Sequence, residues 1–301
     1  MTNLTDILPG ARAEGVGRAG PRLGVAASSV ADRCRGAVAV AAEHADRVDR
    51  DGVFPAEALA ALKAEGLLGA MLPRELGGED ARLSEIASVC FALGRACSST
   101  ALIFAMHQIS LACLLRHGAN SDWQRAFLAR VGREQLLLAS STTEGAKGGA
   151  VRSSDAAIEP CEGGFRLTRA ATVISYGEQA DAIVTTARRA ADAAPSDQVL
   201  VVLPAESCRL QCSGDWDTLG MRGTCSLGFA LAASGVMDQV LSAPYDEIHA
   251  RTMAPVAHLL WSSVWAGIAA EAVERARLAL RKKARTGPVG PGGAHLAEAR
   301  A

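Results

Sequence analysis

The spacing of apolar residues changes twice along this chain of 301 residues, and this change limits the possible folds. Up to about residue 134, apolar side chains recur every three or four residues, as in amphipathic helices. From Gln135 to about residue 243, short β-prone runs alternate with Gly, Pro and Asp, and after Tyr245 the helical spacing returns. No helix-length segment separates the β-prone runs, so the order predicts an α+β fold rather than βαβ units.

Start and stop signals indicate where individual helices lie. Ser99 or Thr100 can cap an apolar helix that stops at Gly118, and this helix is apolar nearly all round, which predicts a buried position. A long helix is expected from near Pro255 to about Arg285.

These patterns divide the chain into four regions. We expect a mobile tail over residues 1–25, an N-terminal helical domain over 26–134 and a middle antiparallel β-barrel domain over 135–243. Residues 244–301 would form a C-terminal helical domain that looks truncated, an incomplete four-helix bundle.

Composition argues against several classes of protein. The 31 Lys and Arg residues are balanced by 32 Asp and Glu residues and interspersed with them, so no nucleic-acid partner is expected. Eight scattered cysteines without a CxxC motif indicate a reducing compartment, no disulfide framework and no metal site. We expect no secretory signal, no uncharged apolar stretch of about 18 residues and hence no membrane span, and we predict a cytoplasmic protein.

One loop near the start of the β-prone region is rich in hydroxyl groups and glycines. It reads "SSTTEGAKGG" over residues 140–149, and it contains neither GxxxxGK[ST] nor GxGxxG. These absences exclude a P-loop and a dinucleotide fingerprint. The loop alone suits either an exposed turn or a cofactor site.

Four segments carry a recognisable pattern: "LGRACSSTALIFAMH" (93–107), "TTEGAKGG" (142–149), "VISYG" (173–177) and "LGMRGT" (219–224). Together they resemble the acyl-CoA dehydrogenase family, flavoproteins that oxidise acyl thioesters. The resemblance runs from about Val30 to Glu298.

This resemblance implies that FAD lies between the middle β-barrel and the C-terminal helices. Ser175 would lie near flavin N5, with Val173 and Ile174 beside the ring. The pyrimidine edge would be lined by Ser141, Thr142 and Thr143. Fixed hydrogen-bonding groups at these positions tune a flavin.

The chain also departs from the family pattern. Gly145 replaces the loop's proline, and Val173 replaces a tryptophan that shields the flavin. No carboxylate matches either position of the family's catalytic glutamate, because Ala257 stands at the earlier one, followed by His258 where an arginine is usual. The catalytic residues are therefore not assigned.

His107 is the one weak catalytic candidate. On its largely apolar helix it can be a core histidine with satisfied hydrogen bonds. The flavin monooxygenase branch of the same fold offers the other interpretation, a pocket histidine that assists the flavin.

The reaction implied by the resemblance is α,β-dehydrogenation of an acyl thioester, with hydride transfer to flavin N5, as in lipid metabolism. The substrate would be an acyl-CoA or an acyl-carrier-protein thioester. The alternatives are a flavin-dependent monooxygenase of the same fold, or a non-catalytic remnant that binds thioesters. We expect a homo-oligomer, or a partner subunit that completes the C-terminal bundle.

Overall fold

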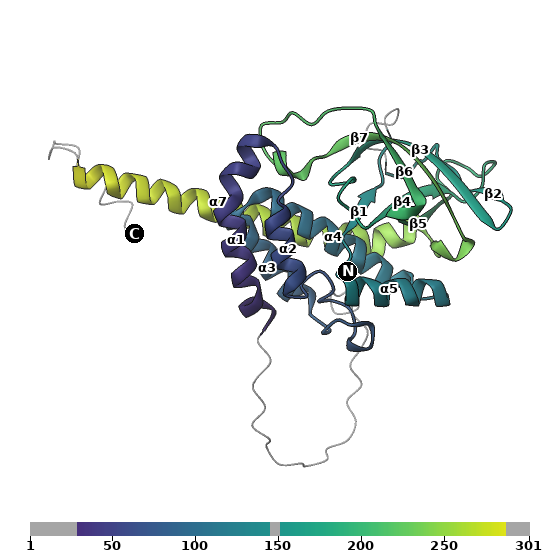
Figure 1. Cartoon of the computed structure of the whole chain (residues 1–301), viewed down its shortest axis with the longest axis horizontal. Coiled ribbons are helices and arrows are strands. Elements are labelled where there is room, and N and C mark those ends of the chain that lie inside the picture. Colours follow the sequence, from purple (N-terminus) through teal and green to yellow (C-terminus); the bar gives the residue numbers. More distant parts are fainter. Residues whose placement is uncertain (1–28, 145–150, 287–301) are drawn as a thin grey trace, which may run out of the picture.

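The computed structural model describes residues 29–144 and 151–286. The tail expected over 1–25 and the glycine-rich half of the 140–149 loop lie outside these described residues. Figure 1 shows a helical part, a part made of β-sheets, and a long C-terminal helix that crosses behind both.

The N-terminal part is helical, as predicted. Its elements are α1 (Val30–Asp51), α2 (Ala56–Ala64), the short turn η2 (Arg74–Leu76), α3 (Leu83–Ala96), α4 (Ser98–His117) and α5 (Asp122–Glu134). The Ser29 hydroxyl accepts the Asp32 N–H at 3.1 Å and so caps α1, which ends at Gly52 in the left-handed conformation. The apolar helix α4 is buried on nearly all sides, because the other helices and the first strand surround it.

The middle part consists of two four-stranded sheets. The first has the order β1-β4-β5-β8, made of β1 (Leu138–Ser141), β4 (Ala182–Arg188), β5 (Gln198–Pro204) and β8 (Val240–Pro244). The second has the order β2-β3-β7-β6, made of β2 (Glu159–Cys161), β3 (Gly164–Ile174), β7 (Leu227–Gly235) and β6 (Cys208–Cys212). Short turns lie at η4 (Ala205–Ser207), η5 (Arg222–Thr224) and η6 (Met237–Gln239).

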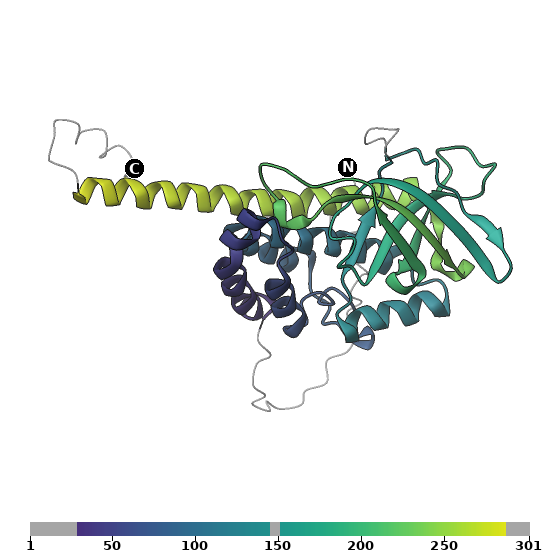
Figure 2. The same cartoon turned by 45° about the horizontal axis from the view of Figure 1, so that its top comes forward.

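The burial of the strands shows how the sheets pack. Strand β3 alternates buried and exposed residues over most of its length, so one of its faces is directed inward and the other to solvent. Every residue of β5 is buried, because its sheet lies between the second sheet and helical elements. Figure 2 shows this layering from a second direction.

One detail of the expected architecture is wrong. The strands form two separate sheets rather than a closed barrel, and β1 runs parallel to β4, with Leu138 opposite Ala182. The chain leaves β1, crosses to the second sheet for β2 and β3, and returns in β4. This crossover allows the parallel pair, which a simple hairpin cannot make.

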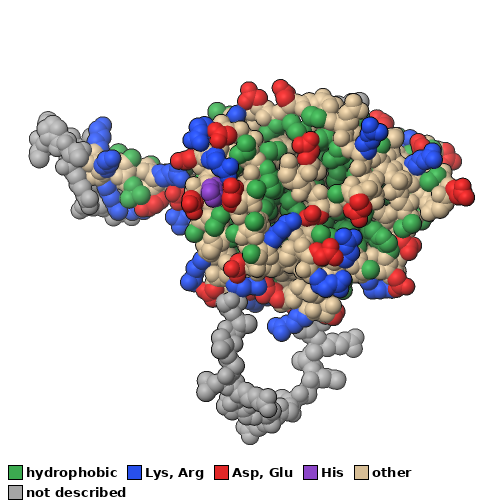
Figure 3. All heavy atoms as spheres, in the orientation of Figure 1, with side chains coloured by type: hydrophobic (Ala, Val, Ile, Leu, Met, Phe, Trp, Pro, Cys, Tyr) green, Lys and Arg blue, Asp and Glu red, His purple; other side chains and the backbone are tan. Residues whose placement is uncertain are grey.

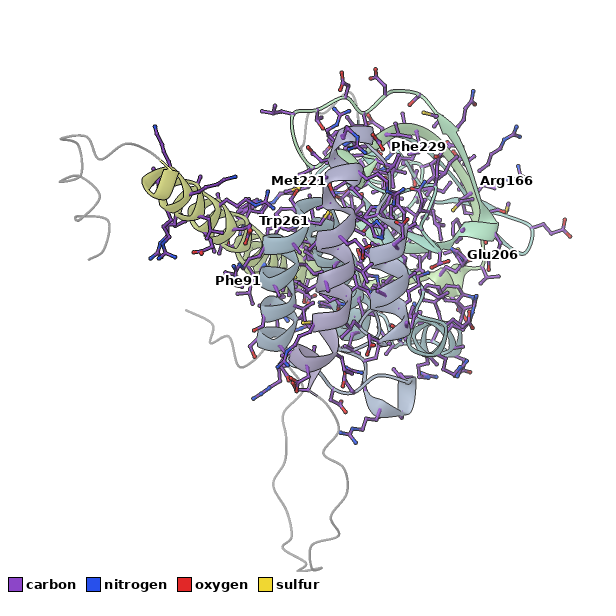
Figure 4. All side chains as sticks on the ribbon, turned by 60° about the vertical axis from the view of Figure 1, so that its left-hand side comes forward. Phe91, Arg166, Glu206, Met221, Phe229 and Trp261 are labelled. Atoms are coloured by element: carbon purple, nitrogen blue, oxygen red, sulfur yellow. The ribbon has the colours of Figure 1, made fainter. Side chains whose placement is uncertain are left out.

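The C-terminal part is one continuous helical run. It begins with α6 (Tyr245–Ile248), passes through the π-helical turn η7 (His249–Met253) and continues as α7 (Ala254–Thr286). The first half of α7 packs on α3 and α4, and its second half projects away from the body (Figure 2). Phe91 of α3 and Trp261 of α7 lie near this packed region (Figure 4).

Two helical segments are long and apolar enough to cross a membrane by length and composition, so the statement that no such stretch exists is wrong. They are Ser98–His117 and Tyr245–Lys283. The window in α4 is 72% buried inside the protein, which is typical of a core helix in a soluble protein. On the face drawn in Figure 3, charges of both signs lie around apolar side chains that gather near its centre.

Candidate functional site

Segments that are far apart in the sequence meet at the junction of α4, η5 and the ends of β1 and β3. The Gly223 N–H donates to the Ser99 hydroxyl at 3.1 Å, which ties η5 to the start of α4. The Tyr176 N–H donates to the Thr224 carbonyl at 2.7 Å, and its hydroxyl donates to the Leu138 carbonyl at 3.0 Å. Three segments that carried the family resemblance therefore lie together.

The fourth segment joins them through an isolated bridge. Glu144 pairs with Ala171 in antiparallel fashion, so residues 141–144 run beside the end of β3. Thr142 and Thr143 are half-buried, and so are Val173 and Ser175 at the β3 end. The bridge thus brings together two segments that are far apart in the sequence, each of which carries half-buried hydroxyl groups.

Two predicted ring-contacting residues have side chains in the core instead. Ser141 is fully buried, its Oγ has no hydrogen-bond partner among the described residues, and its carbonyl accepts the Thr185 hydroxyl at 2.8 Å. Ile174 is also fully buried. Side chains alternate along an extended segment, so Thr142 and Val173 are directed differently from these two neighbours. Only the main chain of Ser141 and Ile174 is then available to a ligand.

Ser175 is the end of a row of three hydroxyl groups. Its Oγ lies 2.8 Å from the Ser226 Oγ, which in turn lies 2.8 Å from the Thr224 Oγ1. The Thr224 hydroxyl donates to the Met221 carbonyl at 2.8 Å. Ser226 is 5% exposed and Thr224 is 1% exposed, so this row leads from the interior to the half-buried Ser175.

The backbone around this row is conformationally constrained. Tyr176, Met221 and Cys225 adopt positive φ angles of 44°, 57° and 45°. Left-handed conformations are unfavourable for residues with a Cβ, and they persist where surrounding contacts fix them. Here they lie directly beside Ser175, Thr224 and Ser226.

Arg222 fixes η5 to the end of α1. Its Nε donates to the Asp49 carbonyl at 2.8 Å, and one terminal nitrogen lies 2.9 Å from the Asp217 carboxylate. A Cβ on Gly223 would lie 2.3 Å from a methyl group of Val48, so glycine is needed for this close approach. Met221 lies close to this end of α1 in Figure 4.

Glu144 forms a buried ion pair at the base of the hydroxyl-rich loop. Its carboxylate lies 3.1 Å from Arg169 and accepts hydrogen bonds from the Ser154 hydroxyl and from the N–H groups of Asp155 and Ala156. Burial opposes its ionisation, but these donors and Arg169 together lower the pKa of the Glu144 carboxyl below its ordinary value. The pair secures the described end of the loop against β3.

His107 is enclosed in the core. Its Nδ1 accepts the Leu138 N–H at 3.1 Å, so its Nε2 carries the proton and donates to the Leu68 carbonyl at 2.9 Å. Burial lowers the pKa of His107 to about 4. Both nitrogens are occupied by main-chain groups, which suits the core interpretation and leaves neither free to assist a flavin.

Two residues of this site, Thr224 and Ser226, were not predicted from the sequence. Ser226 and Thr224 lie beside or within the recognised "LGMRGT" segment, but nothing in their spacing connects them with Ser175. Position 257, which the resemblance matches to a catalytic glutamate, holds a buried alanine, and His258 is exposed. Within the described residues, no group of three His, Cys, Asp or Glu side chains is placed to hold a metal ion.

Comparison with known proteins defines the class of this molecule. Residues 27–135 match the family profile "Acyl-CoA dehydrogenase, N-terminal domain". A structure of KijD3 in complex with FMN and dTDP-3-amino-2,3,6-trideoxy-4-keto-3-methyl-D-glucose superposes with a TM-score of 0.72 at 26% identity, covering 89% of this chain and 66% of that one. A structure of PigA with FAD and proline has the same fold, with a TM-score of 0.65 at 16% identity, covering 85% of this chain and 68% of that one.

Curated proteins of similar sequence include sugar nitrososynthases and an enzyme of acyl-CoA chemistry. L-evernosamine nitrososynthase of Micromonospora sp. is 31% identical over 62% of this chain and 45% of its own length. The amino sugar nitrososynthase DnmZ of Streptomyces peucetius is 29% identical over 81% of this chain and 61% of its own. Acryloyl-CoA reductase (NADH) of Anaerotignum propionicum is 28% identical over 46% and 36%. This chain thus spans about half the length of the curated relatives it matches.

Helices, two packed sheets and a long C-terminal helix make up the fold that this chain shares with the KijD3 and PigA structures. Over residues 27–135 the chain matches the acyl-CoA dehydrogenase N-terminal domain family, and its curated relatives include acyl-CoA enzymes of that family.

Proposed function

We propose that this chain is a flavin-dependent oxidoreductase whose flavin lies against Thr142, Thr143, Val173 and Ser175. The observation that carries this proposal is the bridge between two distant segments that each carry half-buried hydroxyl groups, beside a backbone held in left-handed conformations. Hydroxyl and main-chain groups fixed in this way suit the polar edge of a flavin ring. FAD is the proposed cofactor, and FMN, present in the KijD3 structure, is the alternative.

The residues have distinct tasks in this proposal. Thr142 and Thr143 would hydrogen-bond the polar edge of the ring, and Val173 would cover part of its surface. Glu144 and Arg169 would hold the loop in place, because their ion pair joins it to β3. A bound flavin supplies the redox chemistry, either accepting a hydride or activating oxygen.

Oxygenation of an amino sugar is the first candidate reaction. It is supported by the two nitrososynthases, by the sugar nucleotide in the KijD3 complex, and by an alanine at position 257. The substrate would then be a nucleotide-linked amino sugar, oxidised at its nitrogen. The α,β-dehydrogenation of an acyl thioester is the second candidate, supported by the similarity to acryloyl-CoA reductase and to a cyclohexene carbonyl-CoA dehydrogenase.

Flavin binding is tested by titrating the purified chain with FAD and with FMN while the visible spectrum is recorded. We expect saturable binding of one flavin, weakened by Ser175→Ala and by Thr143→Ala. Ser234→Ala, which removes an exposed hydroxyl at the far end of β7, serves as the matched control. If the chain perturbs the spectrum of neither flavin and retains neither after removal of free flavin, the proposal is contradicted and the non-catalytic, thioester-binding alternative is favoured.

The two candidate reactions are distinguished by adding a different substrate for each to the flavin-loaded chain. Oxygenation predicts that a chemically reduced sample converts a nucleotide-linked amino sugar to a nitrogen-oxidised product when oxygen is admitted. Dehydrogenation predicts instead that an acyl-CoA bleaches the oxidised flavin in the absence of oxygen. Bleaching by acyl-CoA without nitrogen oxidation would overturn the first candidate in favour of the second.

A further inference from the structure

The row of hydroxyl groups behind Ser175 has a direction, which follows from counting its protons. It contains three contacts at 2.8 Å: Ser175 to Ser226, Ser226 to Thr224, and Thr224 to the Met221 carbonyl. Each hydroxyl group brings one proton, whereas the carbonyl brings none and can only accept. Three protons must therefore fill three contacts.

Only one arrangement fills all of them. Thr224 donates to Met221, Ser226 donates to Thr224, and Ser175 donates to Ser226, so every proton points toward the interior. The reverse direction loses the bond from the Thr224 hydroxyl to the Met221 carbonyl, which keeps the Thr224 N–H at 3.0 Å and the Trp216 Nε1 at 3.3 Å as its other donors. Because Ser226 and Thr224 are buried, water cannot easily replace a lost contact, and the inward arrangement is favoured by about one hydrogen bond.

We propose that Thr224 and Ser226 are positioning residues that make Ser175 present its lone pairs, rather than its proton, to a group bound beside it. The buried end of the row, at Thr224, sets the direction in which the hydroxyl protons point. The half-buried Ser175 forms the other end of the row, at the candidate site. Ser175 then acts as a hydrogen-bond acceptor toward the ligand.

This direction distinguishes the two redox states of a flavin. The inference rests on the proposed function, with Ser175 near flavin N5 as the family resemblance implies. Reduced flavin carries a hydrogen at N5 and can donate it, whereas oxidised flavin offers only a lone pair there. An acceptor at Ser175 therefore favours the reduced state, and a donor would favour the oxidised state.

The test compares the dissociation constants for oxidised and reduced flavin, measured anaerobically on the wild-type chain and on Ser226→Ala. Without Ser226, the Ser175 proton is free to point toward the ligand. We expect the preference for reduced flavin to fall about fivefold, the size of one ordinary hydrogen bond. For a two-electron couple this corresponds to a midpoint potential lower by about 20 mV.

Two further variants keep the test independent of folding defects at one position. Thr224→Val should lower the preference in the same way, because Ser226 is left with Ser175 as its acceptor. Thr224→Ser, which keeps the hydroxyl, should restore the wild-type ratio. In a Ser175→Ala background, Ser226→Ala should not change the ratio of the two dissociation constants any further, because the hydroxyl group that faces the ligand has already been removed.

The outcomes separate this inference from the proposed function. A wild-type chain that binds neither redox state overturns both. If the chain binds flavin but the ratio of the dissociation constants for oxidised and reduced flavin is the same in Ser226→Ala, Thr224→Val and the control Ser234→Ala, only the role of the hydroxyl row is overturned. A ratio that shifts in the two row variants and not in the control supports it.

Discussion

His107 is held in a single tautomer by two main-chain groups. The Leu138 N–H occupies Nδ1 and the Leu68 carbonyl occupies Nε2, so the neutral ring links α4, the loop after α2 and β1. Protonation would place a second donor opposite the Leu138 N–H inside the core. The pKa of about 4 follows mainly from burial.

This arrangement predicts a pH-dependent stability. The unfolded chain protonates His107 near pH 6.5, whereas the folded chain does so only near pH 4, so its contribution is complete above 6.5 and is lost as the pH falls toward 4. The loss amounts to about 3 kcal/mol. Urea denaturation between pH 7 and 4 should show a smaller fall in unfolding free energy for His107→Gln than for the wild type. The exposed His258→Gln should keep the wild-type slope, and equal slopes for all three proteins would refute the assignment.

The candidate site was only partly accessible to sequence reasoning. Thr142, Thr143 and Ser175 could be proposed from the sequence because they lie in segments that resemble family motifs, and their role stays a prediction. The burial of the Ser141 side chain could not be predicted, because it depends on which residues of a short strand have their side chains directed inward. Ser226 was missed for another reason: its role depends on a contact across 51 positions, which no local pattern records.

At the scale of elements, α3 and α7 approach each other through glycine. A Cβ on Gly94 would lie 2.5 Å from the Val264 carbonyl, and one on Gly267 would lie 2.2 Å from the Phe91 carbonyl. Both obstacles are backbone atoms, which cannot rotate away. The close approach of these helices therefore requires both glycines.

Gly94→Ala and Gly267→Ala should each destabilise the chain by about 1–3 kcal/mol, because the helices must separate to admit the methyl group. Gly36 provides the matched control, since it is exposed in α1 and a Cβ there meets no atom within 4 Å. Gly36→Ala should stabilise the chain by about 0.5–1 kcal/mol through helix propensity. Urea midpoints measure all three variants, and a loss of stability at Gly36 equal to that at Gly94 would contradict the packing argument.

The helices were better predicted than the strands for a physical reason. Apolar spacing and stop residues are local, and they placed α4 and α7 close to their observed limits. Strands β2 and β8 have few residues and contain Pro160 and Pro244, so neither shows a clear strand pattern. The parallel pairing of β1 with β4 depends on the path of the chain between the sheets, which local sequence does not specify.

At the scale of the whole molecule, the outer half of α7 is exposed. Trp265, Val273 and Leu280 are 55%, 58% and 50% exposed, and their spacing of eight and seven residues places them on one face of the helix. Figure 2 shows that this segment extends beyond the rest of the protein. A projecting helix that exposes apolar side chains gains stability by packing against another helix.

We therefore expect the chain to self-associate through this face of α7, with a second copy as the partner. Light scattering after size exclusion should give a mass above the 31.1 kDa of one chain, decreasing on dilution. The double change Val273→Glu and Leu280→Glu should return the protein to a monomer, because burying two carboxylates in the contact costs more than the apolar area returns. Arg281→Gln alters the charge on another side of the helix and should leave the mass unchanged. A wild-type chain that is monomeric at tens of micromolar would contradict this prediction, whereas flavin binding in the monomeric double variant would show that the hydroxyl-lined site forms within one chain.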